Sequence, residues 1–152
     1  MPTCSFFGHR DCPETIKPRL RDILIELITN CDVDMFYVGN QGCFDAYVRS
    51  ELKKLKQEYP QINYAVVLAY MPGKKTEYDD YSDTMLPEGI ESVHPHYAIS
   101  WRNNWMLKQS DYVVTYITHS WGGAAQYAKK AQIQGKYVIN LIDLGGHIAE
   151  KT

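Results

Sequence analysis

The fold is decided by the stretch Thr115-Tyr116-Ile117-Thr118-His119-Ser120-Trp121-Gly122-Gly123-Ala124-Ala125-Gln126-Tyr127, in which an apolar run passes through a glycine pair into a helical pattern. A strand that turns tightly into a helix directs unpaired backbone N–H groups and the positive end of a helix dipole toward one point. This arrangement suits an anionic group such as phosphate. Two earlier turns have the same form, Phe7-Gly8-His9-Arg10 and Val38-Gly39-Asn40-Gln41-Gly42. We expect all three turns to line one pocket.

Short apolar runs alternate with helical patterns throughout the chain. The runs predict five strands, at residues 4–7, 35–38, 64–70, 111–117 and 136–142. Apolar residues spaced three and four apart predict helices near residues 14–30, 43–58, 97–108 and 123–134. This alternation predicts a three-layer α/β/α fold with a mainly parallel five-stranded sheet. Such sheets bind ligands beyond the carboxyl ends of their strands, where the strand order reverses, and the three glycine turns all follow strands.

Composition and length indicate a single domain and argue against duplex nucleic acid or a membrane as its partner. The 152 residues suit one domain, 1–152, in which residues 71–90 have no clear period and predict a flap. A net charge of −2 supplies no basic field for duplex nucleic acid. Residues 1–7 show neither a basic leader nor an apolar stretch of about 7–15 residues, so we expect no signal peptide. No run approaches the roughly 20 apolar residues of a membrane span, so we expect a cytoplasmic protein without a membrane partner. Four cysteines without C-x-x-C spacing predict no metal site.

The second turn combines two glycines with an acidic residue. Gly39 and Gly42 let the backbone approach a ligand closely, although the turn around Asn40 matches neither the dinucleotide motif nor the P-loop. Asp45 lies in the first turn of the following helix. Its carboxylate can cap backbone N–H groups or accept hydrogen bonds from a ribose, and the sequence favours neither role.

Charged and polar groups accompany the other turns. Arg10 can clamp a phosphate with its planar guanidinium, and His9 can donate a hydrogen bond or act as an acid or base. Alternatively, both are surface residues held by local hydrogen bonds. Arg102 and Asn103 lie on the helix before the fourth strand, where they either enter the pocket from the side or form a surface salt bridge.

Aromatic residues gather near the predicted rim of the pocket. One of them can stack on a base, although aromatic residues also end strands without binding anything. The candidates are Phe44, Tyr70, Tyr116 and Trp121.

The order and spacing of these motifs resemble those of the SLOG superfamily. The similarity covers the chain from Cys4 to about Leu141 and is greatest to the YpsA-like (DUF1273) proteins. The Rossmann-like cores of DprA and of the LOG phosphoribohydrolases are more distantly similar. The matching motifs are Gly8-His9-Arg10, Gly39 with Gly42 and Asp45, Arg102-Asn103-Trp105-Met106, and Gly122-Gly123.

This resemblance implies a Rossmann-like domain that binds a nucleotide or a nucleotide-derived ligand, such as the ADP-ribose-type signals of phage defence. It implies that phosphate and ribose contact Gly8, His9, Arg10, Gly39, Gly42, Asp45, Gly122 and Gly123. From their positions beside the turns we add Asn40, Phe44, Arg102, Asn103, Tyr116 and Ser120. Family members often carry a threonine where this chain has Ala124, so Ser120 or the backbone replaces that hydroxyl.

The LOG enzymes carry a P-G-G-x-G-T-x-x-E pattern whose glutamate takes part in cleaving a nucleoside monophosphate. The corresponding residues 121–128 lack the third glycine and the carboxylate, which argues against the same hydrolysis. Another reaction that uses His9, Asp45 or Glu77 stays open. We therefore expect a sensor or sequestering protein without catalytic residues or a cofactor.

Two other functions are compatible with the sequence. One is a nucleoside-phosphate N-glycosidase, and the other is a protein-interaction adaptor with a vestigial pocket. For any of these functions we expect a homodimer or tetramer, because related domains often pair and the helix at 97–108 is rich in aromatic residues.

Overall fold

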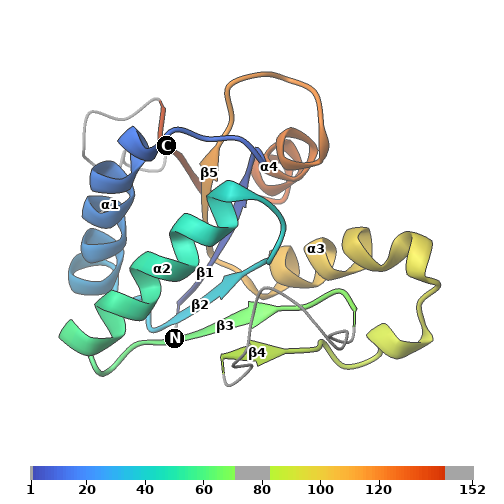
Figure 1. The fold of residues 1–152 in the computed structure, drawn as a ribbon, viewed down its shortest axis with the longest axis horizontal. Coiled ribbons are helices and arrows are strands. Elements are labelled where there is room, and N and C mark those ends of the chain that lie inside the picture. Colours follow the sequence, from blue (N-terminus) through green and yellow to red (C-terminus); the bar gives the residue numbers. More distant parts are fainter. Residues whose placement is uncertain (1, 71–82, 143–152) are drawn as a thin grey trace.

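A sheet of six strands runs through the centre of the computed structural model, which describes residues 2–70 and 83–142 (Figure 1). Every pair of neighbouring strands is parallel. In the spatial order β4-β3-β2-β1-β5-β6, the strands are Thr84–Met85, Asn63–Val67, Met35–Val38, Thr3–Gly8, Tyr112–Tyr116 and Tyr137–Asn140. The predicted α/β class and parallel sheet are confirmed, but the sheet has one strand more than the five predicted.

The additional strand is β4, at the edge of the sheet beside β3. Its two residues, Thr84 and Met85, are too few to show a period in the sequence. The pairing is set by backbone hydrogen bonds, in which the Leu68 N–H donates to the Met85 carbonyl at 2.8 Å. Residues 71–82 of the predicted flap, which include Glu77, lie outside the described residues.

Helices cover both faces of the sheet (Figure 1). Because successive side chains of a strand point to opposite faces, Phe6 packs in a cluster with residues of α1 and α2, whereas Phe7 packs with Met106 of α3 and Tyr127 of α4. The three predicted layers are thus confirmed. No helix among the described residues is long and apolar enough to cross a membrane. The helices are α1 (Lys17–Asn30), α2 (Cys43–Glu58), α3 (Ala98–Gln109) and α4 (Gly123–Ile133), with short 3-10 turns η1 (Glu14–Ile16), η2 (Ile90–Ser92) and η3 (Pro95–Tyr97).

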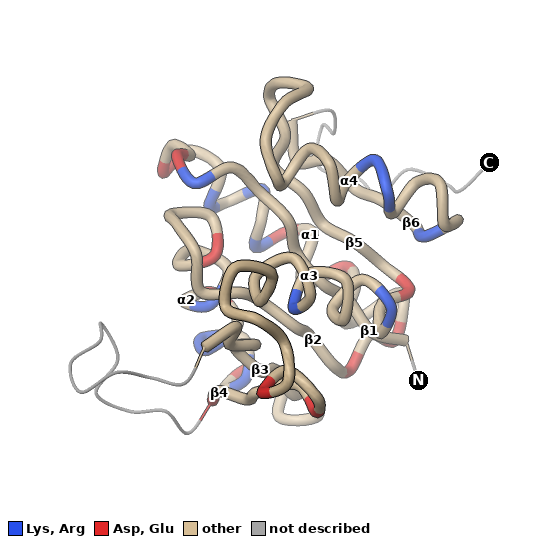
Figure 2. The backbone as a smooth tube through the Cα atoms, turned by 90° about the vertical axis from the view of Figure 1, so that its right-hand side faces the viewer, with Lys and Arg blue, Asp and Glu red and all other residues tan. Residues whose placement is uncertain are grey.

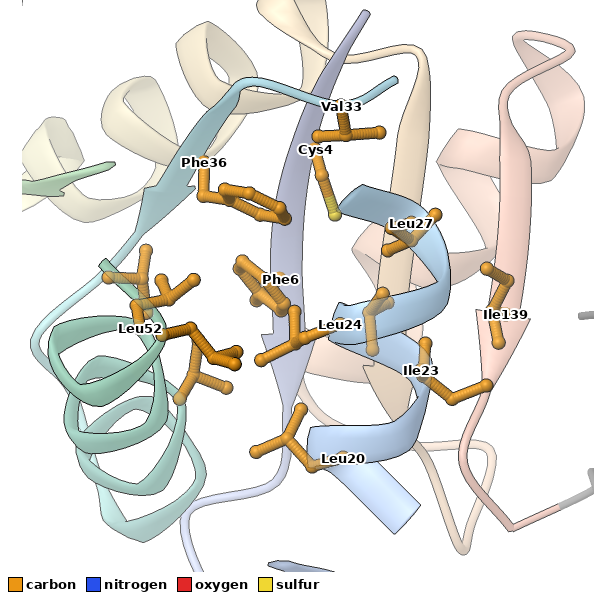
Figure 3. Packing of buried hydrophobic residues seen from close by; sticks show 14 of the residues in the cluster. Cys4, Phe6, Leu20, Ile23, Leu24, Leu27, Val33, Phe36, Leu52 and Ile139 are labelled. Carbon is orange, nitrogen blue, oxygen red and sulfur yellow. The ribbon is translucent and has the colours of Figure 1, made fainter. Parts of the chain in front are cut away.

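The largest hydrophobic cluster lies between the sheet and α1 and α2 (Figure 3). The spacing of Leu20, Leu24 and Leu27 places all three on one side of α1, where they are fully buried. They face the fully buried side chains of Phe6 and Phe36, whose ring centroids are 6.2 Å apart. Burying each such side chain stabilises the fold by about 1.5–3 kcal/mol. This packing fixes β1 and β2 relative to each other.

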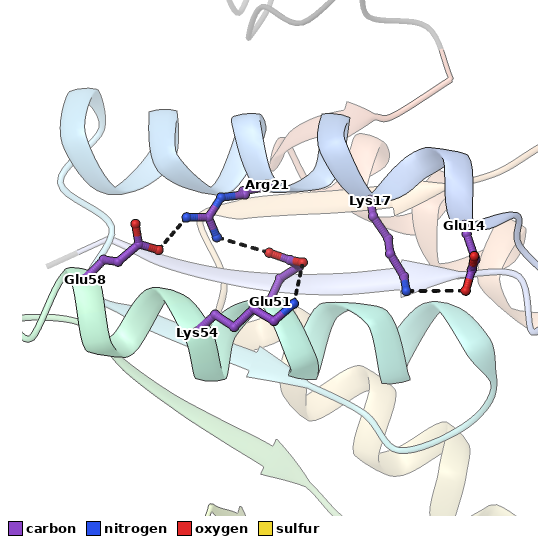
Figure 4. Close-up of polar contacts among 6 residues, drawn as sticks. All are labelled: Glu14, Lys17, Arg21, Glu51, Lys54 and Glu58. Carbon is purple, nitrogen blue, oxygen red and sulfur yellow. Dashed lines mark hydrogen bonds and ion pairs between the residues drawn. The ribbon is translucent and has the colours of Figure 1, made fainter.

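Ion pairs connect α1 to α2 (Figure 4). Arg21 on α1 contacts Glu51 at 3.3 Å and also Glu58, both on α2. Lys54 contacts Glu51 from within α2, at 3.8 Å. Because Arg21, Glu58 and Lys54 are partly exposed, each pair contributes about 1 kcal/mol or less.

The strand order reverses between β1 and β5. From β1 the chain adds β2, β3 and β4 on one side, and then returns to place β5 and β6 on the other side. Gly8, at the end of β1, lies opposite Tyr116, at the end of β5. The loops after these two strands therefore begin side by side, which is the position where parallel α/β sheets bind ligands.

Candidate functional site

A pocket of about 550 Å³ opens at the carboxyl ends of the strands. Its walls come from the loops after β1, β2 and β5 and from α3, so the structure brings the three glycine turns together. The predicted site residues that line this pocket are Gly8, His9, Arg10, Gly39, Asp45, Arg102, Asn103, Gly122 and Gly123. Their contact with a ligand stays a prediction.

Two predicted aromatic residues lie beneath the pocket rather than at its rim. Phe44 is fully buried, and its ring stacks on that of Tyr116 with centroids 6.4 Å apart. A Cβ at Gly8 would lie 2.3 Å from the Phe44 ring, so only glycine fits above it. Phe44 and Tyr116 thus support the floor of the site, and the suggestion that either stacks on a base is corrected by their burial.

The remaining predicted residues lie beside the pocket. Asn40 and Gly42 line a neighbouring cavity of about 560 Å³ that also includes Arg49 and Lys53. Asn40 still touches the site, because its Oδ1 atom accepts a hydrogen bond from Arg102 at 3.3 Å. Ser120 is exposed and is not among the lining residues.

The loop after β1 occupies the N-terminus of α2. The Cys43 N–H donates to the Arg10 carbonyl at 2.7 Å, and the Gln41 N–H donates to Asp45 Oδ2 at 2.9 Å. Gly42 has a φ of 92°, and a Cβ there would lie 2.7 Å from the Arg10 Cα. The chain itself therefore uses backbone donors that the sequence suggested for phosphate, and Asp45 acts as a cap for the turn.

The N-terminus of α4 is open by comparison. Gly122 is its N-cap with a φ of 96°, and no side chain caps the helix. A Cβ built at Gly123 meets nothing within 4 Å among the described residues. Residues 112–128 contain no Lys, Arg, Asp or Glu, which is visible as the uncharged loop leading into α4 in Figure 2. Attraction for an anion at this point thus comes from backbone N–H groups and the helix dipole.

A buried arginine and a buried aspartate face each other across Gly39. Arg102 is 2% exposed, and its Nη1 atom donates to the Val67 carbonyl at 2.9 Å, while Nε donates to Asn103 Oδ1 at 2.9 Å. A Cβ at Gly39 would lie 2.9 Å from Asp45 Oδ2 and 3.1 Å from Arg102 Nη1. Arg102 therefore belongs to the pocket and does not form the surface salt bridge that was its alternative.

Burial changes the acid–base chemistry of this pair. It raises the pKa of Asp45 to about 6, against the opposing effects of the Gln41 N–H and of the charges on Arg102 and Arg10. It also lowers the pKa of Arg102, which the carboxylate of Asp45 partly offsets. The pocket thus contains a carboxyl group that exchanges its proton near neutral pH.

Several residues of the pocket wall were not among the site residues predicted from the sequence. The rings of His9, His119 and Trp121 stack in that order. His9 was predicted to contact the ligand, Trp121 was named only among the aromatic residues that can stack on a base, and His119 had no assigned role. Gln41 also lines the pocket, where its Oε1 atom accepts from Arg10 Nη2 at 2.9 Å. The sequence did contain a signal, because His119 and Trp121 belong to the glycine-pair stretch and Gln41 lies within the second turn.

Hydrogen bonding sets the state of His9. The Thr118 N–H donates to His9 Nε2 at 2.9 Å, so this nitrogen is the acceptor and the ring proton lies on Nδ1. Burial and the neighbouring His119 lower the pKa of His9. Nδ1 of His119 is buried and has no hydrogen-bond partner in the described part of the chain. Within that part, no group of three or more His, Cys, Asp or Glu side chains is placed to hold a metal ion.

Comparisons with known proteins identify the fold. No protein-family model and no curated protein sequence matches the chain. Among solved structures, DNA processing protein A (DprA) from Streptococcus pneumoniae is similar with a TM-score of 0.66 and 13% identity, over 91% of this chain and 49% of that one. The molybdenum cofactor carrier protein of Chlamydomonas reinhardtii is similar with a TM-score of 0.60 and 14% identity, over 91% of this chain and 75% of that one.

These likenesses show a Rossmann-like fold similar to that of DprA. The chain spans about half the length of the DprA chain that it matches. At 13–14% identity the likeness shows the fold alone. No sequence match supports the closer resemblance to the YpsA-like proteins.

Proposed function

We propose that this domain binds a nucleotide or a nucleotide-derived ligand in the pocket at the carboxyl ends of β1, β2 and β5. The observation that carries the proposal is the uncapped N-terminus of α4, which lines the same pocket as Arg10 and Arg102. Backbone N–H groups and guanidinium groups that face one space are typical of phosphate recognition. The phosphate lies at Gly123 in this proposal, and Arg10 reaches it from the loop after β1.

In this proposal the sugar of the ligand lies beside Asp45. The carboxylate of Asp45 accepts hydrogen bonds only, once it has lost its proton, and the hydroxyl groups of a ribose are donors. Asp45 Oδ2 already accepts from Gln41, so the second oxygen is the one proposed for the ligand. Asp45 and Arg102 already occupy the space that a side chain at Gly39 would need, so only glycine at this position lets the pair lie in the pocket wall.

The structural neighbours support a small-molecule role without specifying the ligand. One of them is a carrier protein for the molybdenum cofactor, and the other processes DNA. The SLOG resemblance adds the finer proposal that the ligand is ADP-ribose-like and that the protein senses or sequesters it in the cytoplasm. Assembly as a homodimer or tetramer is part of the same proposal.

One observation favours the N-glycosidase as a second candidate. The pKa of Asp45 is raised to about 6 by burial, and a carboxyl group with such a pKa suits general acid–base catalysis near neutral pH. In that case Asp45 would assist departure of the base from a nucleoside phosphate.

The test is ligand-induced stabilisation. The purified protein is denatured, any released small molecule is identified by mass spectrometry, and melting temperatures are measured with AMP, ADP, NAD and ADP-ribose. A ligand at a hundred times its dissociation constant adds about 2.7 kcal/mol of stability. We expect at least one nucleotide to raise the melting temperature, and the exposed Arg10 to be required for it.

Arg10→Ala is compared with Lys129→Ala, which removes the same charge from an exposed position of α4 outside the pocket lining. Lys129→Ala should keep the ligand effect and Arg10→Ala should lose most of it. Chromatography of the same samples separates binding from turnover, because free base would indicate the N-glycosidase. An unchanged melting temperature across the panel would contradict the proposed function and favour the adaptor.

A further inference from the structure

The loops after β1 and β5 stack three rings on one another beside the pocket. The centroids of His9 and His119 are 3.7 Å apart, with 13° between the ring planes. His119 and the indole of Trp121 are also 3.7 Å apart, at 19°. The other described ring pairs are separated by 4.9 Å or more. This stack is therefore the tightest face-to-face ring packing in the described residues.

The indole of Trp121 is supported on one face and open on the other. Its side chain is 69% exposed although His119 covers one ring face. The start of the loop is anchored to β6, because the Ile117 N–H donates to Asn140 Oδ1 at 3.2 Å and the Ile117 carbonyl accepts from Asn140 Nδ2 at 3.1 Å. A free ring face is thus held in place before a ligand arrives, which lowers the entropy cost of binding.

This open face lies next to the proposed phosphate position. Trp121 directly precedes the N-cap Gly122, and it lines the same pocket as Gly123 and Ala124. A molecule that places its phosphate at the start of α4 therefore brings its neighbouring group near the indole. Residues 112–128 carry no charged side chain, so within this segment stacking on the indole is an attraction available to an uncharged ring.

We infer that Trp121 is the stacking platform for the planar base of a bound nucleoside phosphate, and that His119 and His9 are positioning residues that hold this platform. The inference rests on the proposed function and adds how the base is recognised. Every base has a π-face, so stacking distinguishes a planar heterocycle from a bare sugar phosphate and tolerates different bases. The site therefore distinguishes nucleotides from sugar phosphates more strongly than it distinguishes one base from another.

Calorimetry with AMP, GMP, CMP, UMP and ribose 5-phosphate tests this inference. Loss of a stacked aromatic partner weakens binding by about 5- to 150-fold. Trp121→Ala should weaken the tightest nucleotide by that factor and leave ribose 5-phosphate unchanged, whereas Trp121→Phe should retain most of the affinity. Tyr97→Ala is the control, because Tyr97 is an exposed aromatic residue that does not line the pocket. His119→Ala should reproduce a part of the Trp121→Ala effect.

The outcomes separate the inference from the function on which it rests. If Trp121→Ala binds nucleotides as tightly as the native protein does, the stacking inference is wrong and the phosphate site is unaffected. The same conclusion follows if ribose 5-phosphate binds the native protein as tightly as the nucleotides do. If none of the five molecules binds the native protein, the proposed function fails, and the inference fails with it.

Discussion

Asp45 is the residue whose chemistry is most altered by its surroundings. Burial raises its pKa from an ordinary value of 3.8 to about 6, so the folded protein holds this proton more tightly than the unfolded chain does. Its contribution to stability therefore falls as the pH rises from about 4 to about 6, and it stays low above that range. At about 1.4 kcal/mol per pH unit, the loss is about 3 kcal/mol.

The variant Asp45→Asn isolates this effect. Asparagine retains an oxygen that accepts from the Gln41 N–H but has no proton to lose. Urea unfolding between about pH 4 and pH 7 should show the native protein losing about 3 kcal/mol of unfolding free energy relative to the variant. Parallel pH profiles for the two proteins would show that the carboxyl group is not perturbed.

The site residues that belong to the three glycine turns were predictable from the sequence. Gly8 and Arg10 lie at the end of β1 and in the loop after it, and Gly123 begins α4 after β5, so their arrival at one pocket follows from the parallel sheet. The role of His119 was not predictable, because its stack requires His9 from a loop 110 residues away in the sequence. Phe44 was misplaced because its apolar spacing fits a buried helix face and a pocket rim equally well.

At the scale of elements, β5 contains a buried hydroxyl group that makes no hydrogen bond with the described residues. Thr115 is 1% exposed, and its hydroxyl has no hydrogen-bond partner among the described residues. A buried hydroxyl without a partner costs about 1–3 kcal/mol. Thr115→Val, which replaces the hydroxyl by a methyl group, should leave the unfolding free energy unchanged or raise it by about 1 kcal/mol.

The comparison variant is Thr29→Val at an exposed position of α1, where the hydroxyl donates to the Ile25 carbonyl at 2.8 Å. Chemical denaturation of the two variants should give opposite signs, with Thr29→Val losing about 0.5–1 kcal/mol. A loss for Thr115→Val as large as that of the control would mean that the Thr115 hydroxyl makes a bond in solution.

Helices long enough to show several turns of apolar spacing were predictable from the sequence, whereas the short strand β4 was not. The 14 residues of α1 and the 16 residues of α2 provide several helical turns, and both agree closely with the sequence pattern. In contrast, β4 has only two residues and is defined by its hydrogen bonds to β3. Pairing of this kind depends on a distant segment, so local pattern carries no information about it.

At the scale of the whole molecule, the alternation of strands and helices predicts layers but not the order of the strands. The order places β1 next to β5, and the two loops that follow them become neighbours. The three turns nonetheless differ in what occupies them. Neither α2 nor α4 has a side-chain cap, but the Arg10 carbonyl accepts from the Cys43 N–H at the start of α2, and no such contact reaches the start of α4 among the described residues. The three turns look alike in the sequence. In the structure, the backbone N–H groups that stay open to a ligand are those of the last turn, at the start of α4.

Gly123 allows the phosphate position to be tested without disturbing the fold. A Cβ at this residue meets nothing within 4 Å, and its backbone is not in the left-handed region. An aspartate there should also favour the helix, because a negative charge at an N-terminus interacts well with the dipole, by about 0.3–1 kcal/mol. Gly123→Asn supplies a control of similar size without the charge.

The decisive measurement is the affinity of the tightest nucleotide for the native protein, Gly123→Asp and Gly123→Asn, determined by calorimetry alongside their melting temperatures. Two negative charges about 4 Å apart repel by about 1–4 kcal/mol between water and a protein surface, so Gly123→Asp should weaken binding about fivefold or more. We expect it to remain as stable as the native protein, and Gly123→Asn to bind within a few-fold of it. Equal affinity of Gly123→Asp and the native protein would contradict a phosphate site at the start of α4.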